Sequence, residues 1–273
     1  MGNLCGRGEV INSNTTSEKR RNDENDKFED CNEHYNRGND FNEKKDYKQA
    51  IKEYKKAIEI NPKFYEALYN LGNIYLKLKN YDLAIKCYDE AIEIEENDAE
   101  LWNNKGIAWY FKGKNEKAIE DFDRALEIDH KFSEALYNKG NALDELGKYK
   151  SAIASFEIAL KLQPEFKKAL YNKALSFKSS GDYENALETY KQLLKINPND
   201  YKALTNKGTV LFLMKKYNSA LKAYDRALDI NEHDYHALFN KSQALEKLGD
   251  WKESKELLSY AKEIQKRSRI ESD

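Results

Sequence analysis

The sequence predicts an all-α protein, an α-solenoid built from antiparallel helix pairs. All three prolines and nine of the twelve glycines fall at fixed phases of a 34-residue period. Within each period, apolar and small residues recur with the spacing of one helix face. Charged residues make up 34% of the chain and hydrophobic residues only 40%, which is too polar for one deep globular core. Repeats of this length indicate stacked helical units that bury one another's faces.

The period divides the chain into seven repeats, called repeats 1 to 7, and positions within a repeat are called places. We expect residues 1–30 to form a disordered polar tail and residues 269–273 to form the C-terminal end. The repeats are 31–64, 65–98, 99–132, 133–166, 167–200, 201–234 and 235–268.

Each repeat is predicted to contain two helices. The first has apolar or small residues at the fourth, eighth and eleventh places, and the second at the twentieth, twenty-fourth and twenty-seventh places. Glycine at the fifteenth place ends the first helix, and proline near the end of a repeat stops the second. The last helix should continue towards Ile270. Expected N-caps are Asp46, Asn80, Asp182 and Asp250 for second helices, and Asp30, Asp98, Asp200 and Asp234 for first helices.

Glycine at the eighth place lies inside a predicted helix in five repeats, where it costs about 1 kcal/mol relative to alanine. A compensating contact is therefore expected. Without a side chain at this place, and with alanine at the twentieth, the two helices of a repeat can approach closely beside the aromatic ring at the twenty-fourth place.

These residues resemble the tetratricopeptide repeat, whose pattern has a large residue at the fourth place, Gly at the eighth, Ala at the twentieth, an aromatic residue at the twenty-fourth, Ala at the twenty-seventh and Pro at the thirty-second. The resemblance covers all seven repeats. It implies a right-handed superhelix in which the first helices line a concave groove. Departures occur at Ala174, Leu193, Ser242, Ser254 and Leu258.

Asparagine occupies the sixth place of every repeat. A primary amide can donate to a carbonyl and accept from an N–H group, so a row of amides in the groove could hold an extended peptide. A similar ladder lines the repeat domain of the O-linked N-acetylglucosamine transferases. Alternatively, the asparagines bridge adjacent helices and serve the fold. The ladder consists of Asn36, Asn70, Asn104, Asn138, Asn172, Asn206 and Asn240.

Large side chains are expected to flank the ladder on the same inner surface. Tyrosines at the fifth place could grip apolar groups of a ligand, or could shield contacts between helices. Other groove-facing residues are candidate specificity pockets, or contacts for the termini of the array. The fifth-place tyrosines considered are Tyr69, Tyr137 and Tyr171, and the other residues are Ile107, Tyr110, Phe111 and Phe212.

The resemblance and the ladder predict a protein interaction scaffold or adaptor that binds an extended peptide or a partner subunit. Two alternatives are a chaperone-associated adaptor and the non-catalytic subunit of an enzyme complex. The carboxylate clamp that binds chaperone tails in this family requires lysine at a fifth place, and no repeat has it. A row of lysines at the seventh place could attract an acidic ligand, but pairing with neighbouring carboxylates is the more economical interpretation.

Other classes of function find little support. The four histidines have no metal-ligand spacing, no catalytic motif is present, and we expect no cofactor, no metal and no enzymatic activity. A net charge of -2 gives no reason to expect nucleic acid. No apolar run is long enough to span a membrane. Three cysteines without paired spacing suggest a reducing, cytoplasmic compartment, and we expect a monomer.

The N-terminus carries one further motif. Gly2 follows the initiator and Cys5 follows closely, as in proteins that carry both myristate and palmitate. Position 6 is Gly6 instead of the preferred Ser or Thr. Two acyl chains would give stable membrane attachment where one gives only marginal binding. The alternative is an ordinary polar leader.

Overall fold

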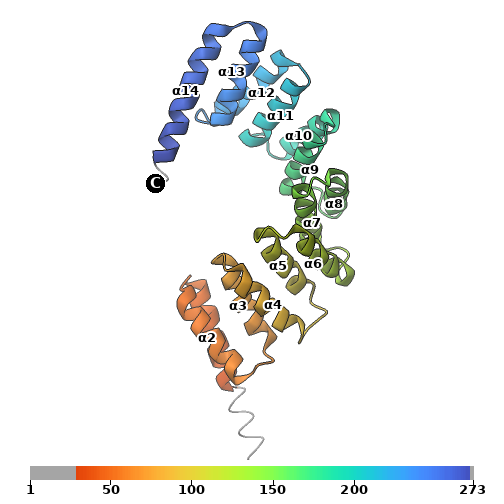
Figure 1. Ribbon diagram of the computed structural model, residues 1–273, viewed down its shortest axis with the longest axis vertical. Coiled ribbons are helices and arrows are strands. Elements are labelled where there is room, and N and C mark those ends of the chain that lie inside the picture. The colour runs from red at the N-terminus through yellow and green to blue at the C-terminus, as the bar shows by residue number, and fades with distance from the viewer. Residues whose placement is uncertain (1–28, 271–273) are drawn as a thin grey trace, which may run out of the picture. The chain divides into compact units, whose positions relative to one another are not determined.

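The computed structural model describes residues 29–270, all of whose regular elements are helices (Figure 1). The chain divides into two compact lobes between Lys114 and Asn115. Within each lobe the helices succeed one another as antiparallel neighbours. The predicted all-α solenoid of helix pairs is confirmed.

The N-terminal lobe begins with a helix over residues 29–43, and consecutive helices pack against each other. Its other helices are α2 (Tyr47–Ile60), α3 (Tyr65–Lys77), α4 (Tyr81–Ile92) and α5 (Ala99–Phe111).

The C-terminal lobe continues the same arrangement, and each helix again packs against the next. The final helix runs to Ile270, as the sequence predicts. The helices are α6 (Asn115–Ile128), α7 (Ser133–Glu145), α8 (Tyr149–Leu162), α9 (Lys167–Ser179), α10 (Tyr183–Ile196), α11 (Tyr201–Leu213), α12 (Tyr217–Ile230), α13 (Tyr235–Leu248) and α14 (Trp251–Ile270).

The mid-helix glycines allow a ring of the second helix to lie against the backbone of the first. A methyl group added to Gly140 would come within 2.5 Å of the Phe156 ring, and one added to Gly208 within 2.4 Å of the Tyr224 ring. Such approaches are impossible for any larger residue unless the ring moves. Both rings are fully buried, so the close contact that the glycine register predicts is present.

Tight turns join the two helices of a repeat. Gly113, Gly147, Gly181 and Gly249 adopt positive φ angles between 70° and 91° there. Three repeats place lysine at this position, and Lys45, Lys79 and Lys215 have φ angles near 60°. Left-handed backbone at a residue with a Cβ atom costs about 1 kcal/mol, so these three turns are strained.

Aspartates cap most of the helices for which a cap is expected. Asp200 accepts a hydrogen bond from the Ala203 amide at 3.0 Å, and Asp98 one from the Glu100 amide at 2.8 Å. Two predicted caps are wrong. Asn80 precedes α4 but makes no capping bond with its side chain, and Asp30 cannot precede the first helix because residues 29 and 30 already belong to it.

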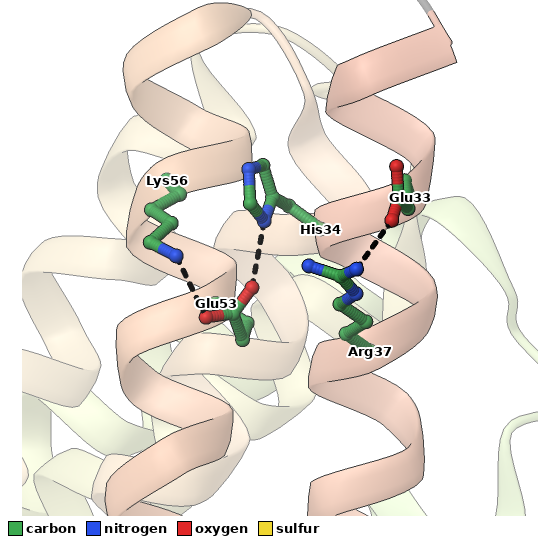
Figure 2. A network of polar contacts seen from close by, with 5 residues as sticks. All are labelled: Glu33, His34, Arg37, Glu53 and Lys56. Carbon is green, nitrogen blue, oxygen red and sulfur yellow. Dashed lines mark hydrogen bonds and ion pairs between the residues drawn. The ribbon is translucent and has the colours of Figure 1, made fainter.

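A polar network replaces an apolar contact in the first helix pair (Figure 2). Repeat 1 has His34 at the fourth place, where the other repeats have leucine or tryptophan. His34 Nδ1 lies 2.6 Å from Glu53 Oε2, and Lys56 Nζ donates to Glu53 Oε1 at 3.0 Å. Burial of Glu53 opposes its ionisation, but the hydrogen bonds from Lys56 and His34 outweigh this and lower the pKa of its carboxyl group.

Candidate functional site: the asparagine ladder and its pocket

In the N-terminal lobe, the ladder side chains reach back to the preceding repeat. Asn70 Nδ2 donates to Tyr35 Oη at 3.2 Å and to Asn39 Oδ1 at 3.1 Å. Asn104 Nδ2 repeats this geometry one repeat later, donating to Tyr69 Oη and to the oxygen of Asn73, both at 3.1 Å. Each sixth-place amide therefore joins the fifth and ninth places of the repeat before it.

The C-terminal lobe contains the same connection in a less regular form. Asn172 Nδ2 donates to Tyr137 Oη at 3.2 Å and to Asn141 Oδ1 at 2.7 Å. Asn206 Nδ2 donates to Tyr171 Oη at 2.8 Å. Leu175 stands at the ninth place of repeat 5 and offers no acceptor, so the second donation of Asn206 goes to a backbone carbonyl of its own helix instead.

The last rung is Asn240, whose Nδ2 donates to Thr209 Oγ1 at 3.1 Å. Among the residues that the structure describes, the ladder thus bridges adjacent first helices through its amide N–H groups. This is the structural role that the sequence left as an alternative. Fifth-place tyrosines are part of the same connection, since their hydroxyl oxygens are the acceptors.

The amide oxygens are used differently from the amide nitrogens. The Oδ1 atoms of Asn70, Asn172 and Asn240 accept no hydrogen bond from a described residue and are not buried. Asn104 Oδ1 accepts from Asn103, and Asn206 Oδ1 accepts from Lys178 Nζ at 3.3 Å. Asn70 and Asn172 therefore donate twice within the fold and keep an accessible acceptor oxygen, whereas Asn240 donates once and also keeps its oxygen accessible.

A pocket of about 520 Å³ opens along α9, α11 and α13, beside two asparagines of the ladder. The ladder contributes Asn206 and Asn240 to it, and the fifth place contributes Tyr171. These helices are the first helices of repeats 5, 6 and 7, so the pocket lies on the ladder side of the lobe. Its lining residues are Tyr171, Lys178, Tyr201, Lys202, Thr205, Asn206, Thr209, Asp234, His236 and Asn240.

The charged residues of the pocket differ in how far other residues of the protein already satisfy them. Asp234 accepts from the Thr205 hydroxyl at 2.8 Å and from the His236 amide at 3.2 Å, so its carboxylate is already satisfied. Burial lowers the pKa of Lys178, because the charged ammonium group loses hydration. Lys202 is exposed at the start of α11. The pocket therefore contains two lysines and one carboxylate that is already hydrogen-bonded.

Other predicted site residues lie elsewhere. Phe111 is 58% exposed at the end of α5, where its ring stacks on Tyr81 and contacts Tyr110, while Ile107 is half-buried in the same helix. Phe212 contacts Tyr217 and does not line the pocket.

The remaining predicted site residues are two ladder asparagines, Asn36 and Asn138, and the N-terminal motif. Asn36 is exposed and Asn138 is half-buried. Gly2 and Cys5 lie outside the described residues, and their acylation stays a prediction. Among the residues that the structure describes, no helix is both long and apolar enough to cross a membrane. The same residues contain no cluster of three or more His, Cys, Asp or Glu side chains arranged to hold a metal ion.

Most seventh-place lysines are paired with the preceding repeat. Lys105 contacts Asp89 at 2.8 Å, Lys139 contacts Asp123 at 2.5 Å, Lys173 contacts Glu157 at 3.0 Å and Lys241 contacts Asp225 at 2.8 Å. Each carboxylate stands at the twenty-fifth place of the repeat before. The lysine row is therefore largely a set of ties between repeats, as the more economical interpretation of the sequence predicts.

Family models identify the repeats. Tetratricopeptide repeat models match residues 65–98, 99–132 and 201–234, a further one matches 137–201, and a model described as a TPR repeat matches 38–79. The chain belongs to the tetratricopeptide repeat family. No curated protein sequence matches this TPR chain.

Solved structures with the same fold include several TPR proteins. One from Parabacteroides merdae has a TM-score of 0.69 at 20% identity and covers 86% of this chain and 93% of its own. YrrB, described as having an unusual peptide-binding site, has a TM-score of 0.59 at 23% identity, covering 68% of this chain and 95% of its own. Pseudomonas aeruginosa pilF reaches 0.61 at 20% identity, with 74% and 97% covered.

Proposed function

We propose that this TPR protein is an interaction scaffold that binds an extended peptide, or an extended segment of a partner subunit, along its asparagine ladder. Its family and the peptide-binding relative YrrB support a role in protein interaction. TPR repeats are generally non-catalytic scaffolds, and a binding role agrees with that. The observation that carries the proposal is the pocket formed by α9, α11 and α13 around two rungs of the ladder.

The free oxygens of the ladder define how the peptide would be held. An extended peptide presents backbone N–H groups at regular spacing, and each can donate to an amide oxygen without any requirement on the side chain. Asn172 and Asn240 offer such oxygens, whereas the Asn206 oxygen is shared with Lys178. The ladder thus serves the fold through its N–H groups and the ligand through its oxygens.

The pocket supplies selectivity for one side chain of the peptide. Lys178 and Lys202 favour a carboxylate there, with Tyr171 and Tyr201 as flanking aromatic surface. This recognition differs from the carboxylate clamp of chaperone adaptors. Tyr171, Thr205 and Phe239 occupy the fifth places in repeats 5 to 7, so no lysine stands where that clamp needs one.

A peptide-display selection against the full chain tests the proposal. Peptides enriched on the wild type are then measured against Lys202→Glu and against Lys168→Glu. Lys168 is the control because it holds the same second place one repeat earlier, is exposed, and does not line the pocket. We expect Lys202→Glu to weaken binding at least about tenfold, through loss of one attraction and gain of one repulsion, and Lys168→Glu to leave it unchanged.

Two results would contradict the proposal. One is a selection that enriches no peptide. The other is a set of peptides that bind wild type and Lys202→Glu equally, which would place the binding surface away from this pocket. Binding of an acidic chaperone tail peptide in preference to the selected peptides would favour the adaptor alternative.

A further inference from the structure

One seventh-place lysine has no carboxylate partner. In repeat 6 this place holds Lys207, and the twenty-fifth place of repeat 5 holds Lys191, whereas repeats 2, 3, 4 and 6 have Asp or Glu at that place. No described carboxylate forms an ion pair with Lys207. The ion pair that joins neighbouring repeats elsewhere is therefore missing between α10 and α11.

Lys207 is close enough to two other cationic side chains for their charges to affect it. Its side chain is half-buried, and burial, together with the charges of Arg226 and Lys191, lowers the pKa of its ammonium group. Lys191 comes from α10, Lys207 from α11 and Arg226 from α12, three helices that lie side by side in Figure 1. We call Lys191, Lys207 and Arg226 the cationic cluster.

Nearby carboxylates are already committed elsewhere. Glu188 accepts from Lys191 Nζ at 3.2 Å within α10, and both side chains are more than half exposed, so this contact neutralises Lys191 only weakly. Asp225 pairs with Lys241 of the following repeat. Gathering three cations with only this weak compensation is unfavourable, and no carboxylate of the described residues forms an ion pair with Lys207.

We propose that the cationic cluster is a second binding site, which accepts a carboxylate from an acidic segment of a partner protein. Four equivalent positions in the same chain show that a lysine at this place is shaped to meet a carboxylate at 2.5 to 3.0 Å. At repeat 6 no residue that the structure describes provides the complementary group, and in this proposal a partner supplies it. A carboxylate on an aspartate or glutamate side chain has the size and charge of the group that repeats 2, 3, 4 and 6 provide.

This site is separate from the ladder. None of its three residues lines the pocket, and Lys207 follows Asn206 by one position, so the two side chains point to different sides of α11. The cationic cluster could therefore hold one partner while the ladder holds another. Binding at the cationic cluster does not require a peptide in the pocket.

A fluorescent hexaglutamate peptide is the probe, with hexaglutamine as its uncharged counterpart, and fluorescence anisotropy at low ionic strength is the readout. The variant is Lys191→Glu, which introduces the acid that repeats 2, 3, 4 and 6 have at this place and so closes the site from within. Lys150→Glu is the control, because it makes the same charge change at an exposed position of α8. Lys191→Glu should weaken hexaglutamate binding at least about tenfold, whereas Lys150→Glu should change it less than about twofold.

Folding of the variant is checked separately. A restored pair between Glu at position 191 and Lys207 should raise the thermal midpoint by about 1–3 °C, so loss of binding cannot be ascribed to unfolding. The reverse change, Glu157→Lys beside Lys173, removes the acid from an intact pair and should create a second hexaglutamate site.

Chemical protection locates the bound peptide. Reductive methylation followed by mass spectrometry should show Lys207 protected by hexaglutamate and not by inorganic phosphate. Protection of Lys202 without protection of Lys207 would assign the peptide to the pocket and overturn the proposal. So would equal loss of binding in Lys191→Glu and Lys150→Glu, binding of hexaglutamine with the same affinity, or equal protection by phosphate.

Discussion

The hydroxyl group of Tyr190 tests the hydrogen bond between the twenty-fourth-place tyrosine and the ninth-place residue of a repeat. Its side chain is fully buried, and its Oη atom has no hydrogen-bond partner among the described residues. In repeats 1 and 2 the equivalent tyrosines donate at 2.7 Å to the ninth-place asparagines Asn39 and Asn73. Repeat 5 has Leu175 at that place, so the acceptor is missing.

The expected effect of Tyr190→Phe follows from this difference. A buried hydroxyl without a partner costs about 1–3 kcal/mol of desolvation, and phenylalanine removes that group while keeping the ring. We therefore expect Tyr190→Phe to stabilise the C-terminal lobe by about 1 kcal/mol. The matched change Tyr88→Phe removes a hydrogen bond at 2.7 Å and should cost about 0.5–1.5 kcal/mol.

Thermal unfolding followed by circular dichroism measures both variants. A change of about 1 kcal/mol corresponds to roughly 2–4 °C in the larger C-terminal lobe, which holds Tyr190, and to about 4–8 °C in the smaller N-terminal lobe, which holds Tyr88. The two variants should move the midpoints of their lobes in opposite directions. Leu175→Asn provides a reciprocal check, because it supplies an acceptor for both Tyr190 and Asn206. If Tyr190→Phe destabilises the protein as much as Tyr88→Phe does, the hydroxyl of Tyr190 has a partner and the reasoning is refuted.

Three further changes test other parts of the structure. Lys79→Gly relieves a φ angle of 59° and should raise the free energy of unfolding by up to about 1 kcal/mol in urea titrations; a decrease would show that the turn is not strained. The pKa of Glu53 is lower in the folded protein than its unfolded value of about 4.5, so its ionised carboxylate stabilises the fold above that pH, and this stabilisation is lost as pH falls through the folded pKa. Glu53→Gln should therefore make the loss of stability below about pH 4.5 less steep. An unchanged acid transition would contradict the network. Asn172→Ala removes two bonds between repeats and should cost about 1–3 kcal/mol although alanine favours helix; an unchanged midpoint would argue against the bridge.

Much of the fold follows from the sequence because the signals are local or strictly periodic. The phase of Gly140 relative to Phe156 predicts both the helix pair and the close contact between them. Helix caps are harder to predict from the sequence, because a side-chain oxygen before a helix can also bond to the backbone in other turn geometries. Asn80 illustrates this, because α4 begins after it without a capping bond from its side chain.

The orientation of the ladder asparagines cannot be predicted from a single repeat. Whether a sixth-place asparagine faces a ligand or a neighbour depends on how repeats are stacked, and its acceptors lie 31 and 35 residues earlier. A signal for the bridge was present in the sequence: Asn39, Asn73 and Asn141 recur at the ninth place. That co-occurrence could have predicted the direction of the amide groups.

The pocket and the cationic cluster depend on exceptions to the repeat pattern. Lys178 and His236 line the pocket at places where other repeats have different residues, so no periodic rule singles them out. Lys207 looks like any other seventh-place lysine until its position opposite Lys191 is known. To predict such features, the residues that lie next to a side chain in space must be known, and not only its position within the repeat.

The central claim is that the ladder binds a peptide through amide oxygens that accept from peptide N–H groups. A backbone ester scan of a display-selected peptide tests this most directly, because each ester removes one N–H donor while keeping the extended shape. If the claim holds, esters at positions facing Asn172 or Asn240 weaken binding about two- to tenfold, which corresponds to about 0.5–1.5 kcal/mol for each lost hydrogen bond. If no ester changes the affinity, the peptide is not held by the ladder.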